Sequence, residues 1–176
     1  GVIAGNGPLI QRVRTVALKH LGVPMGPQEA YLLQRGVKTL PLRMQAHCEN
    51  AAKVAAFLAS HPKVAKVYFP GLPSHLGHQV IADTANGFGG MVALDLAGGF
   101  ADAARFLDNL NLFAQAVSLG DLESLACHPA STTHAAMSPE DRAKAGVTEQ
   151  LVRLSIGVED ADDLIEDLAR ALSFLA

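Results

Sequence analysis

The chain has 176 residues, of which 49% are apolar and 18% charged, a composition typical of a globular protein rather than a disordered one. Its formal net charge is −3, which is not the basic excess expected of a nucleic-acid-binding protein. Two cysteines favour a reducing compartment, and no apolar run approaches the roughly 20 residues of a membrane helix. We therefore expect a cytoplasmic protein without nucleic-acid or membrane partners.

The sequence begins in a way that is typical of the middle of a protein. Gly1–Gly5 contains no Met and no polar tail, and its apolar residues 2–4 predict a short buried strand. Because natural N-termini are usually frayed polar ends, we expect the chain to be a piece of a longer protein. A first helix is predicted to begin at Asn6–Pro8, and a second runs from Pro27 to near Gly36.

The later segments alternate between helical and strand patterns. A long helix is predicted over 41–60, where apolar residues recur every three or four positions until Pro62 ends it. Strand patterns cover 63–69, 91–96, 113–117 and 151–156, and helix patterns cover 77–85, 102–110, 138–146 and 161–175. Because helices dominate the first part and strands and helices mix in the second, we place a domain boundary after residue 60.

Several motifs that are often functional have simpler structural explanations here. Gly5–Gly7 lacks the third glycine of a dinucleotide motif and the lysine of a P-loop. His75 and His78 have no third ligand nearby, and Cys127-His128 lacks the second pair of a zinc site. The acidic run from Glu159 to Asp163 is interpreted as acids at a helix start. We expect no metal site.

Two features indicate a site at the end of a sheet. Ser118 and several backbone amides follow the predicted strand 113–117. Arg153 lies among apolar residues of the strand 151–156, where a cation is costly to bury without an anion. An internal salt bridge and a two-point grip on a substrate carboxylate explain this arginine equally well.

Four segments in this order resemble the C-terminal part of the Cys/Met-metabolism family of pyridoxal-phosphate enzymes. They are SLGDLESL (118–125), HPASTTH (128–134), SPEDR (138–142) and LVRLSIGVED (151–160). The earlier segments RGVKTL (35–40) with Arg43-Met44 and YFPGLPSH (68–75) agree with them. The resemblance covers essentially the whole chain.

The resemblance implies an α/β fold of the aspartate-aminotransferase-like kind, fold type I. Residues 1–60 would end the large domain that binds pyridoxal 5′-phosphate (PLP), including the interdomain helix. Residues 61–176 would form the small C-terminal domain, with a mostly antiparallel sheet and covering helices. In the family, the lysine that forms the Schiff base lies upstream of the segment that matches Gly1–Gly5. We therefore assign no catalytic residue here, and we expect the chain alone to be inactive.

Site residues follow from the resemblance position by position. Arg153 matches the arginine that binds the substrate α-carboxylate, and Ser118 matches a residue that helps there. Thr133 matches a threonine that lines the active site near the cofactor lysine. Lys19 matches a lysine of methionine γ-lyases that reaches the neighbouring subunit's site, although the next residue here is His20 and not Asp.

Val117 bears on the choice of substrate. Members that process cystathionine usually have Glu at this position, where a carboxylate suits the distal ammonium of cystathionine. An apolar valine instead suits the thioether tail of methionine. The implied activity is that of a carbon–sulfur lyase performing α,γ-elimination of L-methionine to methanethiol, ammonia and 2-oxobutanoate.

Alternatives remain open within and outside the family. A cystathionine γ-lyase or γ-synthase comes second and a homoserine sulfhydrylase third, since sulfhydrylases usually have an Asn-containing version of Ser118–Gly120. As a fragment, the chain is alternatively a catalytically silent module for folding or assembly. The family also implies a small amino-acid substrate as partner and a homotetramer built as a dimer of dimers.

Overall fold

The computed structural model describes residues 3–22 and 25–175, which fall into two units, Gly1–Leu40 and Pro41–Ala176. In the first unit, α1 (Gly7–Arg12) begins where the Asn6 side chain accepts a hydrogen bond from the backbone N–H of Leu9 at 3.0 Å. It continues as the π-helical η1 (Val13–Leu18), and α2 (Pro27–Val37) follows. Both predicted helices are confirmed, and none of the described residues of this unit is buried.

The strand predicted at residues 2–4 is wrong for the two of these residues that the structure describes. Val2 lies outside the described residues. Ile3 and Ala4 are in no strand, and Ile3 is 72% exposed. A strand needs a neighbour to pair with, and none of the described residues pairs with these two.

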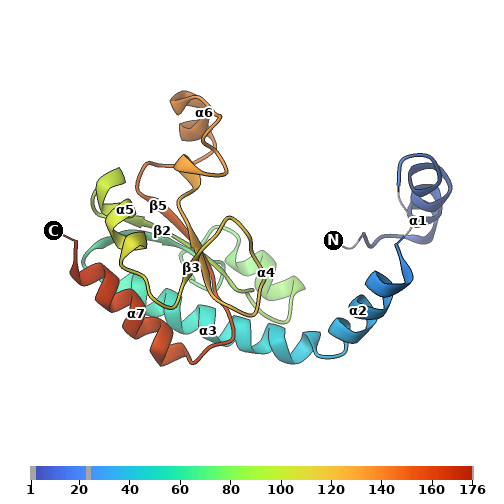
Figure 1. The fold of residues 1–176 in the computed structure, drawn as a ribbon, viewed down its shortest axis with the longest axis horizontal. Coiled ribbons are helices and arrows are strands. Elements are labelled where there is room, and N and C mark those ends of the chain that lie inside the picture. Colours follow the sequence, from blue (N-terminus) through green and yellow to red (C-terminus); the bar gives the residue numbers. More distant parts are fainter. Residues whose placement is uncertain (1–2, 23–24, 176) are drawn as a thin grey trace. The chain divides into compact units, whose positions relative to one another are not determined.

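The second unit contains a five-stranded sheet and its helices (Figure 1). The strands are β1 (Val64–Tyr68), β2 (Met91–Leu96), β3 (Ala114–Gln115), β4 (Leu125–Cys127) and β5 (Leu151–Ser155). The helices are α3 (Leu40–Ser60), α4 (His78–Thr84), α5 (Phe100–Asp108), the 3-10 turn η2 (Pro129–Ser131), α6 (Pro139–Lys144) and α7 (Ala161–Ser173).

The sheet has the order β1-β2-β5-β4-β3 and is antiparallel except for the pair β3–β4. This confirms the predicted α/β class with a mostly antiparallel sheet. Two details differ from prediction: β3 is shorter than 113–117, and β4 had not been predicted. The helix expected at 102–110 begins two residues earlier, because the Asp102 carboxylate accepts from the Gly99 N–H and so lies in the first turn.

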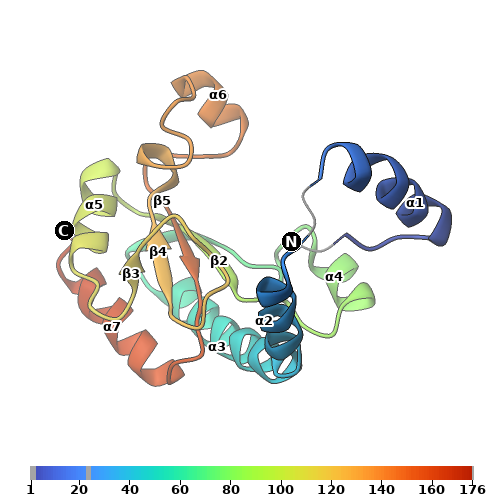
Figure 2. The same cartoon turned by 45° about the vertical axis from the view of Figure 1, so that its right-hand side comes forward.

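The core lies on one face of the sheet, where α3 and α7 run side by side (Figures 1 and 2). Strand residues at alternate positions point into it and are fully or almost fully buried: Val92, Leu94, Leu96, Val152, Leu154 and Ile156. The helices contribute Ala51, Val54, Ala55, Leu58, Ala103, Phe106, Leu164, Leu168 and Leu172. Such burial supplies the main favourable free energy of folding. It also leaves the alternate strand residues on the opposite face, where Arg153 lies.

The long helix α3 belongs with the sheet in this chain, because its buried stripe is part of that core. The second unit accordingly begins at Pro41. The boundary after residue 60 concerns the domains of the complete protein and stays a prediction. Among the described residues, no helix combines the length and apolar character needed to span a membrane.

Candidate functional site

Arg153 is held by backbone carbonyl groups rather than by a carboxylate. Its neighbours Val152 and Leu154 are fully buried in the core, so the pleat of β5 directs Arg153 to the other face. Its Nη2 donates to the carbonyl oxygens of Val117 at 2.9 Å and Ser118 at 3.1 Å. Within the part of the chain that the structure describes, no carboxylate pairs with Arg153. Its charge therefore remains available for an anion.

The loop after β3 carries the two partners of Arg153. The Ala116 N–H donates to the carbonyl of Ala126, which ties the start of the loop to β4. Farther on, Gly120 has φ of +75°, a left-handed conformation that favours glycine, and its N–H donates to Ser155 Oγ at 2.9 Å. The structure thus brings Arg153, Val117 and Ser118 together, and the Ser118 side chain is exposed.

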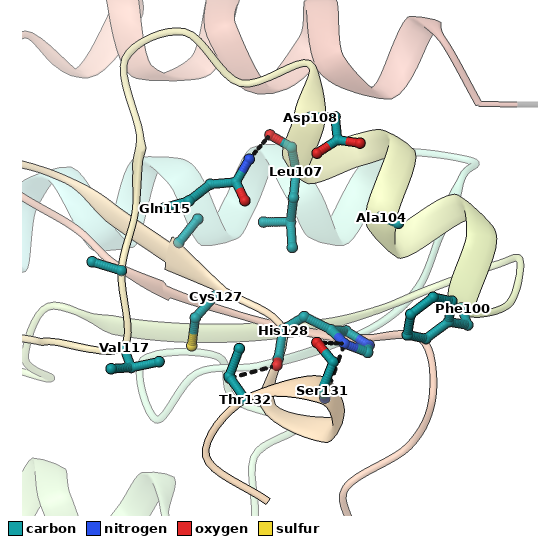
Figure 3. A pocket seen from close by; sticks show the side chains of 12 residues that line it. Phe100, Ala104, Leu107, Asp108, Gln115, Val117, Cys127, His128, Ser131 and Thr132 are labelled. Atoms are coloured by element: carbon teal, nitrogen blue, oxygen red, sulfur yellow. Dashed lines mark hydrogen bonds between the residues drawn. The ribbon is translucent and has the colours of Figure 1, made fainter. Parts of the chain in front are cut away.

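A pocket of about 340 Å³ lies beside Val117, between α5 and strands β3 and β4 (Figure 3). Most of its wall is apolar and includes Phe100, Ala104, Leu107 and Val117. The sulfur of Cys127 points into the space between Val117 and Thr132. Asp108 and Gln115 line one end of the pocket, whereas His128 and Ser131 lie near the other.

The Cys127 thiol adds no charge to the wall of this pocket near neutral pH. Burial raises the pKa of the Cys127 thiol, and the positive charge of Arg153 only partly opposes this. Cys127 therefore stays a protonated thiol and acts as an apolar wall residue. His128 is buried and uses both ring nitrogens, with Nδ1 2.9 Å from Ser131 Oγ and Nε2 2.9 Å from the carbonyl oxygen of Glu149.

The remaining predicted site residues are Thr133 and Lys19. Thr133 is exposed, and its hydroxyl lies 2.8 Å from Nδ1 of His134. Its neighbour Thr132 lines the pocket that Val117 also lines. Lys19 is exposed and belongs to the first unit, whereas Arg153 belongs to the second.

Sequence reasoning missed most of the pocket wall. Phe100 and Leu107 come from α5, and Cys127 comes from the unpredicted β4, so no local pattern links them to Val117. A signal was available for Ser155, because it lies two positions after Arg153 and therefore shares its face of the strand.

The pocket beside Val117 is not by itself a site for PLP. A PLP enzyme needs a lysine amine at the reacting end of the substrate, and no lysine lines the pocket beside Val117. Lys63 instead donates to the carbonyl of Leu175 at 2.6 Å, and the Lys66 amine lies 4.5 Å from the centre of the Tyr68 ring. No group of three potential metal ligands occurs within the described ranges.

Comparisons with known proteins identify the family that this chain resembles in sequence. The family described as Cys/Met metabolism PLP-dependent enzyme matches residues 1–173. The chain is 47% identical to L-methionine γ-lyase of Pseudomonas putida over 173 residues, 98% of this chain and 44% of that protein. It is 48% identical to cystathionine γ-lyase of Bacillus subtilis over 151 residues, 86% of this chain and 40% of that protein.

A solved structure agrees in fold. Cystathionine γ-synthase of Xanthomonas oryzae pv. oryzae, crystallised in complex with cystathionine, is similar with a TM-score of 0.89 and 46% identity. The similarity covers 97% of this chain and 44% of that one. The chain thus spans less than half the length of these relatives.

Proposed function

Because the chain belongs to the Cys/Met metabolism family of PLP-dependent enzymes, we propose that the complete protein is a carbon–sulfur lyase acting on L-methionine. The reaction would be α,γ-elimination to methanethiol, ammonia and 2-oxobutanoate. The supporting observation is that Val117, whose carbonyl holds Arg153, also borders a pocket with a largely apolar wall. A carboxylate-binding group and a site for a thioether tail are therefore adjacent.

Each residue has a proposed role in binding and orientation. Arg153 binds the substrate α-carboxylate through the guanidinium nitrogens that Val117 and Ser118 leave free, and the Ser118 hydroxyl assists. Thr133 lines the site near the cofactor lysine, and Lys19 reaches the site of a neighbouring subunit. Residues outside this chain would mainly hold PLP, which would supply the electron-withdrawing group that the elimination needs. Fixing the carboxylate orients the reacting bonds.

A second candidate substrate is cystathionine, and Asp108 is the observation that favours it. This exposed carboxylate lines the far end of the pocket, and no described residue forms an ion pair with it. A distal ammonium of cystathionine would find a partner there. The cystathionine γ-lyase of B. subtilis is about as similar to this chain as the methionine γ-lyase of P. putida.

The complete protein is further proposed to be a cytoplasmic homotetramer, a dimer of dimers. In this arrangement, residues 1–60 would end its cofactor domain and residues 61–176 would form its small domain. The 176-residue chain by itself would be catalytically silent, because the lysine that binds PLP is proposed to lie outside it.

Steady-state kinetics of the full-length enzyme on methionine and cystathionine test the proposal. The wild type should have the higher kcat/KM on methionine. Val117→Glu should shift the ratio toward cystathionine by about 10-fold or more, the effect of one charge-assisted hydrogen bond. Val80→Glu is the matched control, since Val80 is an exposed valine of α4 away from the pocket.

The variants separate the two candidates. A wild type that prefers cystathionine, and loses this preference in Asp108→Asn, would favour the second candidate over the first. An unchanged ratio in Val117→Glu, with both activities falling together, would mean that Val117 only packs, and the specificity argument would be wrong.

A further inference from the structure

The loop that orients Arg153 is attached to the chain segment 153–159. Arg153 holds the carbonyls of residues 117 and 118, and Ser155 Oγ accepts from the Gly120 N–H. Farther along the chain, the Gly157 N–H and the Glu159 carboxylate bind Ser124, which lies at the end of the same loop. β5 ends at Ser155 and residues 158–159 form a bend, so the segment 153–159 holds the loop through both side chains and backbone N–H groups, including the Val158 N–H, which donates to the carbonyl of Leu122 at 2.9 Å.

Glu159 is the attachment at the far end. Its Oε1 accepts from the Ser124 N–H at 2.6 Å, and its Oε2 accepts from Ser124 Oγ at 2.9 Å. Ser124 Oγ also accepts from the Gly157 N–H at 2.8 Å, and Ser124 is fully buried. Both carboxylate oxygens are thus engaged in charge-assisted hydrogen bonds to one buried residue.

The surroundings leave this junction little freedom to move. A Cβ on Gly157 would lie 2.2 Å from Glu159 Oε2 and 2.3 Å from the carbonyl oxygen of Leu122, so only glycine fits. Asn50 Nδ2, from α3, donates to the carbonyls of Gly157 at 3.2 Å and Glu159 at 2.7 Å. The backbone that presents the Glu159 carboxylate is therefore itself anchored to a core helix.

We propose that Glu159 is a positioning residue for the carboxylate-binding group. It touches neither Arg153 nor the pocket, but it fixes the loop whose carbonyls at Val117 and Ser118 orient the guanidinium. This inference rests on the proposed role of Arg153 as the group that binds the α-carboxylate. It adds that the geometry of Arg153 depends on a carboxylate six residues along the chain.

The test compares two ligands of the full-length holoenzyme. L-norleucine has the amine, the carboxylate and an apolar tail of methionine's length but no sulfur to eliminate, whereas pentylamine has the same amine and tail but no carboxylate. Glu159→Gln keeps one acceptor oxygen but turns an NH₂ group toward a donor of Ser124. We expect this variant to weaken equilibrium binding of norleucine about 10-fold and to leave binding of pentylamine unchanged. Glu166→Gln, at an exposed carboxylate of α7, is the matched control.

A double-mutant cycle gives a second measurement. In the Arg153→Lys background, Glu159→Gln should weaken norleucine binding by less than 3-fold, because the group that Glu159 positions is gone. Equal weakening of both ligands, or additive effects in the cycle, would show that Glu159 only stabilises the fold and would overturn the inference. Failure of methionine turnover with this binding pattern intact would contradict the proposed reaction but support the positioning role.

Discussion

Replacing Asp167 by Asn should loosen the turn that leads into β3 and onward to Val117. Asp167 lies on α7 and is 5% exposed. Its carboxylate accepts from the Asn111 N–H at 2.9 Å, from the Leu112 N–H at 2.9 Å and from Arg170 Nη2 at 2.6 Å. One buried carboxylate therefore holds the turn against the helix.

The magnitude follows from what an asparagine can replace. Its single oxygen can accept from Arg170 or from the turn, while its NH₂ group must face another donor. Losing one charge-assisted hydrogen bond costs about 1.5–3 kcal/mol, and leaving a buried partner of an ion pair uncompensated costs about 3–5 kcal/mol. Because Arg170 is partly exposed, we expect a loss of about 3 kcal/mol from the free energy of unfolding.

The same variant should change how stability depends on pH. Burial by itself would raise the pKa of Asp167, but hydrogen bonds from Arg170 and from the backbone of the turn outweigh it and lower the pKa below 3.8. The unfolded chain therefore binds this proton at a higher pH than the folded chain does. Asp167 stabilises the fold above its unfolded pKa, and this contribution is lost as pH falls through the folded pKa.

Urea unfolding of the full-length protein at pH 7 and pH 3 measures both effects. At pH 7 the urea midpoint of Asp167→Asn should be lower than that of the wild type. At pH 3 the difference between the two midpoints should be smaller. Hydrogen exchange at the amides of Asn111 and Leu112 should accelerate in the variant. The control Asp163→Asn, at an exposed carboxylate of the same helix, should change neither this exchange nor the pH dependence of the urea midpoint. The reasoning would be refuted if exchange at these amides were unaltered and the difference in urea midpoint between wild type and variant were the same at pH 7 and pH 3.

Two further predictions concern Arg153 and the cofactor. Arg153→Lys in the full-length enzyme should lower kcat/KM about 10- to 100-fold, because lysine cannot make the two-point grip on the substrate carboxylate. Arg105→Lys, on the exposed side of α5, should leave kcat/KM unchanged. Wild-type kinetics in Arg153→Lys would contradict the proposed carboxylate-binding role of Arg153. Residues 1–176 expressed alone should give no borohydride-stable pyridoxyl adduct at a single lysine, as read by peptide mass spectrometry, and a stoichiometric adduct at one lysine would disprove this.

Elements with strong periodicity were predictable from the sequence, and short ones were not. β2 has the predicted bounds, and α7 has the predicted apolar stripe with Asp160 as its cap. The three residues of β4 follow a segment rich in turn-forming residues, so their strand conformation depends on pairing with β5. Pairing with β5, rather than the local sequence pattern, therefore determines that these residues form a strand.

The candidate site divides in the same way. Arg153 was identifiable because a cation between buried apolar residues is costly. The choice between a salt bridge and a free cation required the structure, which pairs Arg153 with two carbonyls. The interpretation of Glu159 as a helix-start acid was wrong, because its carboxylate binds Ser124. That partner lies 35 residues away and is invisible to local sequence rules.

The attachment of α3 to the end of β5 also constrains the order in which the chain assembles. Nδ1 of His47 donates to the carbonyl of Ile156, and Asn50 reaches Gly157 and Glu159, across separations of 107 to 109 residues. Closing so long a loop has a large entropic cost and slows folding relative to local contacts. During synthesis, α3 emerges long before β5 and α7, so the part of its apolar stripe that packs with them stays uncovered until residues 151–173 have left the ribosome. Apolar surface exposed in this way makes incompletely synthesised chains prone to aggregation.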